Sequence, residues 1–345
     1  MNHLEICGHV KQVENLTRTE VEEWDRLSVA TTSARSPFMS VHFARAVAES
    51  GVDARACVLH QSDEIRAFFP YQYSSKLGRW LKAAQRIGGE LSDAFGIVAQ
   101  NGFQIETAAL LRLAHINYIH FTHLDEAQLG HGLHGEKPRT GLRIQLDQSS
   151  NNPLKTAHSV DRKYLKDTER RQRKLCDEVG PITFQFDVEQ DRDDLLSELV
   201  NKKRAQYKTS GVDDALSSPW KRQTLRHLSN YRFATCRGIL STMFAGDKWI
   251  ASHFGLMGNG IFHLWLPVYN PEFSRYSPGR LLLHHILESS GTHGLHKIDR
   301  AEGDTPTKRE TANEEYKLYR GIWRNKTGAS QINHRFNQVK WKLGL

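Results

Sequence analysis

The chain has 345 residues, more than one hydrophobic core usually organises, so we expect two domains. With 39% hydrophobic and 25% charged residues, the composition is that of a water-soluble globular protein and excludes a fibrous or disordered one. No run approaches the roughly 18 apolar residues of a membrane span, and the first residues contain no apolar signal segment, so we expect a cytoplasmic protein.

The cysteines argue against a disulfide framework and against a zinc site built from Cys. They lie far apart and form no CxxC pair: Cys7, Cys57, Cys176 and Cys236. Such spacing favours reduced thiols, and no metal cofactor is expected.

Positive charge is concentrated in the second half of the chain. Residues 1–150 carry 15 lysines and arginines against 17 aspartates and glutamates, whereas residues 151–345 carry 32 against 22. This asymmetry favours an anionic partner for the second half, such as a phosphate-bearing cofactor, a nucleic acid or an acidic membrane surface. A well-solvated basic surface is the alternative.

In the first half, hydrophobic periodicity and turn residues indicate mixed helices and strands. The patterns predict helices over 36–51 and 104–114 and strands over 54–61, 64–74 and 118–124. A polar Ser62–Asp63 turn joins the first two strands. The polar, turn-rich segment 147–160 is the best boundary candidate, which gives domains at 1–150 and 151–345.

The second half opens with a predicted helix over 161–180 that has seven cations between Arg162 and Lys174. Its apolar stripe is weak, so the helix face either contacts an anion or is simply solvated. Further patterns predict a strand over 182–186, a helix over 191–211, an antiparallel meander over 239–244, 249–257 and 261–270, and a strand over 295–304.

Between the meander and the last strand, Ser277, Pro278, Gly279 and Arg280 stand where a helix should begin. Pro suits the first helical turn, and Gly allows a ligand to approach the backbone closely. Unpaired N–H groups and the helix dipole favour a phosphate there, and Arg280 adds a charged donor. An ordinary capped helix start is the alternative.

This order of elements resembles the core of the GNAT acyltransferases. Three segments, 162–184, 251–283 and 294–308, resemble more closely the CelD/BcsL-type acetyltransferases associated with cellulose and other polysaccharide biosynthesis, and the first half resembles that family's degenerate domain. The resemblance implies a mixed α+β fold of two tandem GNAT-like domains, each a largely antiparallel sheet flanked by helices. It also implies a distant relation to the FemABX aminoacyltransferases.

The family's last segment typically has Asp, then Gly with an acidic or amide residue, then Tyr-Lys. Asp299, Gly303, Asp304 and Lys308 match it, whereas Thr307 stands in place of the usual Tyr. The resemblance implies acetyl-CoA or another acyl-CoA as co-substrate. The residues expected to contact it are Leu266 and Val268 on the splayed strand, and Tyr276, Ser277, Gly279, Arg280, Leu281 and Lys308.

Acyl transfer from a thioester needs a base for the acceptor and donors for the developing oxyanion. His253 is the first choice as base, with a structural strand histidine as the alternative. Asp299 is expected to orient His253 or to accept a proton itself. The structural alternative is a cap or an ion pair with Arg300 or Lys308. Tyr269 would return a proton to the leaving thiolate. No Ser-His-Asp or Cys-His spacing is evident, so direct transfer is preferred to a covalent intermediate.

Three functions stay open at this point. The first is an acyl-CoA-dependent N- or O-acyltransferase acting on an anionic or sugar-containing acceptor, a glycolipid or an amine precursor. The second is an aminoacyl-tRNA-dependent transferase, which is the one function of the three with a nucleic-acid partner. No DNA partner is expected. The third is a non-catalytic member of a polysaccharide-synthesis complex.

Overall fold

The computed structural model describes residues 5–146 and 162–325, which form two compact units. Unit 1 comprises Met1–Arg139 with Lys317–Leu345, and unit 2 comprises Thr140–Tyr316. The chain enters unit 2 within strand β7 (Glu136–Gln145) and leaves it within β13 (Glu314–Arg324). The expected boundary segment 147–160 lies outside the described residues, and the functional division into 1–150 and 151–345 stays a prediction.

Unit 1 is built on a mostly antiparallel sheet with the order β1-β2-β3-β4-β6-β13, to which β5 is added beside β3. The one parallel pair that the described strands of this unit form is β4 with β6. Its elements are β1 (Ile6–Gln12), α1 (Arg18–Ala30), α2 (Val41–Glu49), β2 (Asp53–Gln61), β3 (Glu64–Tyr73), α3 (Lys76–Trp80), β4 (Ala83–Arg86), β5 (Val98–Ala99), α4 (Thr107–Leu113) and β6 (Tyr118–Asp125).

The first-half elements predicted from the sequence are confirmed. Ser62 and Asp63 both have positive φ, 54° and 62°, as a two-residue hairpin turn between β2 and β3 requires. Helix α2 begins at Val41 because Ser40 caps it, its hydroxyl accepting the N–H of His42.

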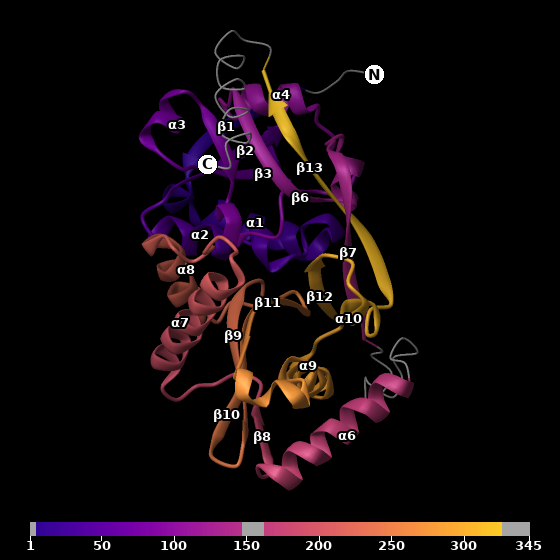
Figure 1. Ribbon diagram of the computed structural model, residues 1–345. Helices are drawn as coiled ribbons and strands as arrows, with labels where there is room; N and C mark the ends of the chain where they lie inside the picture. The colour runs from indigo at the N-terminus through magenta and orange to yellow at the C-terminus, as the bar shows by residue number, and fades with distance from the viewer. Residues whose placement is uncertain (1–4, 147–161, 326–345) are drawn as a thin grey trace. The chain divides into compact units, whose positions relative to one another are not determined.

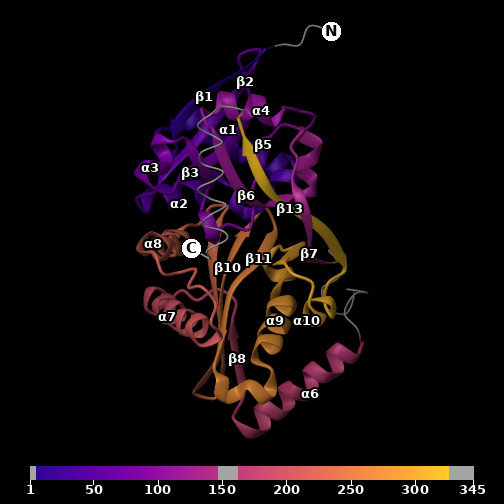
Figure 2. The same cartoon turned by 45° about the horizontal axis from the view of Figure 1, so that its top comes forward.

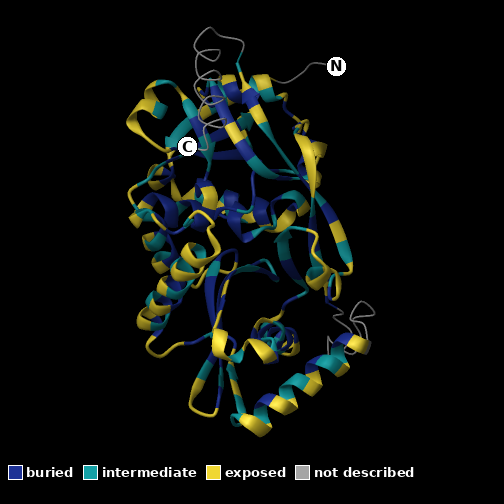
Figure 3. Ribbon diagram, in the orientation of Figure 1, coloured by how far each residue is buried: buried dark blue, intermediate teal, exposed yellow. Residues whose placement is uncertain are grey.

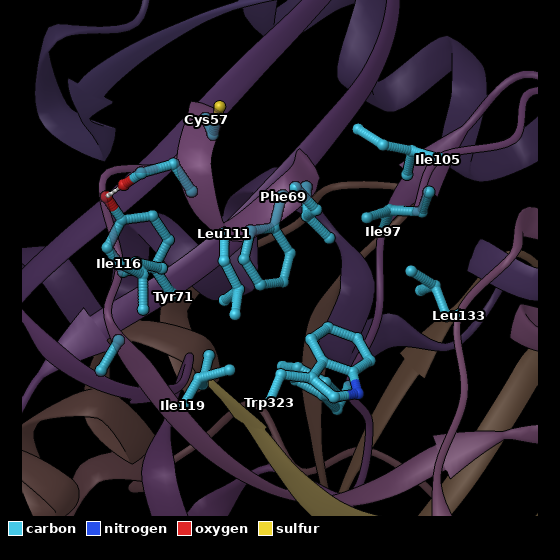
Figure 4. Close-up of a cluster of buried hydrophobic side chains, with 14 of the residues drawn as sticks. Cys57, Phe69, Tyr71, Ile97, Ile105, Leu111, Ile116, Ile119, Leu133 and Trp323 are labelled. Carbon is cyan, nitrogen blue, oxygen red and sulfur yellow. Dashed lines mark hydrogen bonds between the residues drawn. The ribbon is translucent and has the colours of Figure 1, made fainter. Parts of the chain in front are cut away.

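The core of unit 1 lies against β3, β6 and the end of β13 (Figure 4). Trp323 of β13 contacts the rings of Phe95 and Phe121 at centroid distances of 5.1 and 4.7 Å. The hydroxyl of Tyr71 is buried but donates to the carbonyl of Ala114 at 2.9 Å, so this core leaves that polar group satisfied.

Unit 2 has a six-stranded sheet with the order β7-β12-β11-β10-β9-β8. All neighbours are antiparallel except β11 and β12. The elements besides β7 are α6 (Arg162–Glu178), β8 (Ile182–Gln185), α7 (Arg192–Ser210), α8 (Pro219–Asn230), β9 (Arg237–Ala245), β10 (Lys248–Gly258), β11 (Ile261–Tyr269), the 3-10 helix η6 (Pro271–Tyr276), α9 (Pro278–Ser289), β12 (Lys297–Glu302) and α10 (Pro306–Arg309).

The predicted meander is confirmed as β9, β10 and β11. Gly246 and Asp247 connect the first two strands, and Asn259 with Gly260, both at positive φ, connect the second two. Helix α8 was not expected from the sequence, although Pro219 at its first turn and the buried Leu225 and Leu228 are typical helix signals.

Different helices cover the two faces of the unit 2 sheet (Figures 1 and 2). Helix α9 packs on β10 and β11 from one side, with α6 against it, and its apolar residues are buried almost throughout (Figure 3). Helices α7 and α8 cover the other side. The expected mixed α+β architecture is therefore confirmed. None of the described helices combines the length and the apolarity needed to cross a bilayer.

Candidate active site in unit 2

Strands β11 and β12 pair for only three residues and then separate. Ile261–His263 lie beside Lys297–Asp299, and the described residues form no β11–β12 pair beyond these. Strand β11 instead continues along β10 as far as Tyr269 opposite Ala251. The backbone of β11 after His263 is therefore open on its β12 side.

A bulge accompanies this divergence. Leu264 and Trp265 of β11 stand opposite the single residue Gly255 of β10. The Nε2 atom of His253 accepts the N–H of Trp265 at 2.9 Å, so the ring proton is on Nδ1. That Nδ1 is buried without a hydrogen-bond partner among the described residues. Burial, together with the charges of His263 and Lys203, lowers the pKa of His253 to about 3.

Asp299 lies buried in a network that satisfies its carboxylate. Arg143 Nε donates to Oδ2 at 3.0 Å, while Tyr316 Oη and the N–H of Ala301 donate to Oδ1 at 2.9 and 2.8 Å. Burial alone would raise the pKa of Asp299, but the charges of His263 and Arg143 and the hydrogen bonds outweigh it, so the pKa is lowered.

The partner of Asp299 differs from the two expected. Arg300 donates to the carbonyls of Thr307 and Lys308, and Lys308 Nζ donates to the carbonyl of Glu302 at 2.7 Å. The ion pair is made by Arg143 on the neighbouring strand β7 instead. This residue lies 156 positions earlier in the chain, beyond the reach of a local motif.

His253 and Asp299 point to opposite faces of the sheet. The ring of His253 contacts that of Phe262 at a centroid distance of 5.4 Å, whereas Asp299 Oδ1 lies 3.8 Å from Nδ1 of His263. Phe262 and His263 are consecutive strand residues and so face opposite sides. The two side chains therefore do not meet, and Asp299 does not orient His253, which was one of the roles expected for it.

Tyr269 shares the α9 face with His253, because its register partner Ala251 belongs to the core that α9 covers. The Tyr269 side chain is 43% exposed. The N–H of Asn270 bonds to Ile250 of β10, so by alternation the N–H groups of Leu266 and Val268 also point towards β10. The open side of β11 presents the backbone of Tyr269 rather than that of Leu266 or Val268.

Sequence reasoning missed Lys203. From α7, its Nζ donates to the carbonyl of Pro267 at 3.1 Å, on the open side of β11, and also to Gln206 at 3.2 Å. Burial lowers the pKa of Lys203. No signal in the sequence distinguishes this lysine from the other cations of an amphipathic helix.

The start of α9 combines an unusual backbone with open space. Ser277 is in the left-handed region at φ 56° and ψ 63°, and Pro278 occupies the first turn. A Cβ added at Gly279 would meet no atom within 4 Å, so the backbone is accessible there. Leu281, by contrast, is fully buried in the core, and the hydroxyl of Tyr276 donates to Glu178 at 2.5 Å.

Arg280 borders a pocket of about 750 Å³. Its guanidinium lies over the ring of Tyr164 at 4.4 Å and pairs with Glu310 at 2.6 Å. The pocket is lined by Lys163, Tyr164, Lys166, Asp167, Arg170, Arg280 and Glu310. Four cations against two carboxylates leave it positive. It lies where α9 and α10 follow the diverging ends of β11 and β12, a location suited to an anion.

Residues 162–318 match the model of the acetyltransferase (GNAT) domain, so this part of the chain is similar to GNAT-type domains. Helix α6, the meander, α9 and β12 all lie within it. No curated protein matches the sequence.

Solved structures with the same fold share little sequence with the chain. FemX is 10% identical, with a TM-score of 0.59, and 90% of this chain and 96% of FemX are covered. The C-terminal domain of a protein described as a putative lysylphosphatidylglycerol synthetase, from Agrobacterium fabrum, is 11% identical, with a TM-score of 0.54. The match covers 92% of this chain and 95% of that domain. A conserved protein of unknown function from Bacteroides thetaiotaomicron is 10% identical, with a TM-score of 0.53. The match covers 91% of this chain and 98% of that protein. Such similarity establishes the fold alone.

Proposed function

We propose that the chain is an acyl-CoA-dependent N- or O-acyltransferase of the CelD/BcsL type, which transfers an acetyl or other acyl group directly to a sugar, a glycolipid or an amine precursor. The observation that carries this proposal is the divergence of β11 and β12 after His263 and Asp299, in a GNAT-type domain. A thioester arm can then lie along the open side of β11 between the two strands.

The phosphates of the acyl-CoA would bind at 276–281 and in the adjoining positive pocket. The first turn of α9 offers the N–H of the accessible Gly279, since Pro278 has none and those of Arg280 and Leu281 donate to the carbonyl of Ser277. Arg280 offers a charged side-chain donor. Lys163, Lys166 and Arg170 supply further positive charge, which is what a multiply charged phosphate group needs. Lys308 would stabilise the loop at Gly303 through its bond to Glu302 rather than contact the cofactor.

The acyl carbonyl would lie beside the open part of β11. There the Tyr269 N–H and the Lys203 ammonium can donate to the oxygen as it becomes negative. The acceptor nitrogen or oxygen forms a bond to the carbonyl carbon, and the carbon–sulfur bond breaks. The departing thiolate takes a proton from the exposed Tyr269 hydroxyl on the α9 face. The acceptor gives up its own proton to solvent as the new bond forms, and solvent returns one to the Tyr269 phenolate, so the protons balance.

His253 and Asp299 would serve this site as positioning residues. The Nε2 of His253 is already engaged by Trp265, and the Asp299 carboxylate by Arg143, Tyr316 and Ala301. Neither group offers a free basic atom in this arrangement. Each instead fixes the strand that borders the opening, β11 in one case and β12 in the other.

The test is calorimetric titration of the full chain with CoA, acetyl-CoA and tRNA, using two variants of Gly279. Because the space above Gly279 is open and Asp is well tolerated in a first helical turn, Gly279→Asp should fold normally. We expect it to lose CoA affinity by roughly tenfold or more through charge repulsion, since each tenfold corresponds to about 1.4 kcal/mol. The neutral control Gly279→Asn should bind within a few-fold of wild type.

The other two functions are outcomes of the same titrations. Binding of tRNA with a steep salt dependence, and no binding of CoA, would identify an aminoacyl-tRNA-dependent transferase. Binding of neither would favour a non-catalytic partner protein. Equal CoA affinity in wild type and Gly279→Asp would show that the phosphates bind elsewhere.

A further inference from the structure

Cys7, His9 and His60 converge on the outer face of the antiparallel pair β1–β2 in unit 1. Cys7 lies directly opposite His60 in the antiparallel register, and His9 is two residues along β1 on the same face. Gly8, between them, faces the interior: a Cβ there would meet Leu113 at 2.9 Å and Cys57 at 3.0 Å. The three side chains therefore project away from the core together.

The potential ligand atoms of these residues lie within 4.8 Å of one another. Zn–S and Zn–N bonds of about 2.3 and 2.0–2.1 Å in a tetrahedral site place ligand atoms roughly 3.4–3.7 Å apart. A contraction of about 1 Å would complete the geometry. Cys7 and His9 are exposed and His60 is half-buried, so side-chain rotation can provide it without moving the strands.

The chemistry of the three ligands selects the cation. One sulfur and two imidazole nitrogens suit Zn²⁺, whereas Ca²⁺ and Mg²⁺ require oxygen ligands. Two ligands at positions i and i+2 of one strand and a third on the next strand present three atoms to one point, which leaves the fourth position to solvent. Elsewhere among the described residues, no second group of three His, Cys, Asp or Glu has this proximity.

We propose that Cys7, His9 and His60 form a Zn²⁺ site that joins the outer strand β1 to β2. Strand β1 ends the sheet order, and among the described strands it pairs with β2 alone, so a single ladder supplies its backbone pairing. A metal bound to ligands on both strands would stabilise that ladder. This proposal is independent of the transferase function, because all three residues belong to unit 1.

The site is tested with the reduced, chelator-treated full chain and Co²⁺ as a spectroscopic probe for the metal. We expect one Co²⁺ per chain, a thiolate-to-cobalt charge-transfer band, and loss of both signals on adding Zn²⁺. Zn²⁺ should also raise the Tm. Cys7→Ser should lose the band, and His60→Ala should lose tight binding, whereas the control Cys176→Ser, which alters a cysteine of unit 2, should keep both.

The proposal is overturned if no charge-transfer band forms, or if the band persists in Cys7→Ser. Equal weak binding by wild type, Cys7→Ser and His60→Ala would mean adventitious surface binding. Circular dichroism of each variant without metal separates loss of the ligand from loss of the fold. Acyl-CoA binding serves as a second control, because it should be unchanged in all three variants.

Discussion

The Nε2 atom of His253 accepts the N–H of Trp265 at 2.9 Å, and this bond crosses the bulge between β10 and β11. It gives an acceptor to a part-buried backbone donor at the bulge. Gly255 has no side chain at the position that the imidazole occupies, since a Cβ there would overlap the His253 ring. His253 thus stabilises the bulge at which β11 diverges from β12.

His253→Ala should destabilise the protein and widen this bulge. It removes the acceptor of a part-buried N–H, which costs about 1 kcal/mol, and leaves a cavity as well. His253→Gln keeps an acceptor oxygen at similar reach and should recover part of the loss. Urea unfolding measures both. If His253→Ala loses turnover but keeps wild-type stability, the histidine is a catalytic base rather than a positioning residue.

The low pKa of His253 also predicts a pH dependence of stability. In the unfolded chain its pKa is the ordinary 6.5, whereas in the folded protein it is about 3. Between these values only the unfolded chain binds the proton, so the free energy of unfolding falls as the pH falls below 6.5. The slope reaches about 1.4 kcal/mol per pH unit. Denaturant unfolding measured at several pH values between about 7.5 and 4.5 should show that the free energy of unfolding falls more steeply with falling pH in wild type than in His253→Gln.

Asp299→Asn should destabilise the fold rather than act only on turnover. The variant leaves the half-buried Arg143 without the Asp299 carboxylate, although its longer contact to Glu314 at 3.6 Å stays, and weakening such a pair costs up to about 3 kcal/mol. Asp247→Asn is a matched control, because Asp247 pairs with Lys248 on the surface and should change stability by less than about 0.5 kcal/mol. Chemical unfolding at neutral pH compares the two. A fully stable, inactive Asp299→Asn would instead identify Asp299 as a proton acceptor.

The position of Tyr316 in this network can be tested through Gly141. A Cβ at Gly141 would overlap the Tyr316 ring, and the Arg143 guanidinium lies over the same ring at 3.3 Å. Gly141→Ala should therefore cost about 1–3 kcal/mol through overpacking. Combined with Tyr316→Ala, the same substitution should cost much less, because the overlap is gone. Additive costs in this double-mutant cycle would mean that the ring does not lie against Gly141.

Local signals in the sequence were sufficient for most elements of the fold. The β9–β11 meander follows from Gly-containing turns between apolar runs, and the start of α9 follows from Pro278 after a strand. These features depend on residues within a few positions of one another. The family resemblance then indicated two domains, each a largely antiparallel sheet flanked by helices, which local patterns alone leave open.

The side-chain environments of the site could not be predicted in the same way. Alternation assigns a strand residue to a face only when every bulge is known, and the bulge at Leu264–Trp265 leaves no clear mark in the sequence. The Arg143–Asp299 pair depends on the register of β7 with β12. The convergence of Cys7 with His60 likewise depends on a ladder between residues 53 positions apart, so spacing along the chain indicated no metal site.

The basic helix α6 separates into cations that border the pocket and cations that do not. Lys163, Lys166 and Arg170 line the pocket, whereas Lys174 is absent from its lining and lies 3.8 Å from Glu178 one turn later. Arg170 and Lys174 are both largely exposed, so a substitution at either should leave the fold intact. They form a matched pair for testing whether the pocket, rather than the whole helix, attracts the anionic ligand.

Arg170→Glu should weaken binding of CoA, and lower kcat/KM once an acceptor is known, by roughly tenfold at low ionic strength. Lys174→Glu should change either quantity far less, although both substitutions alter the net charge equally. The difference should shrink as salt is added, because charges are screened within about 8 Å at physiological ionic strength. Titrations at several salt concentrations measure this. Equal effects of the two reversals would indicate long-range attraction by the whole helix, and no effect of either would indicate that the helix face is only solvated.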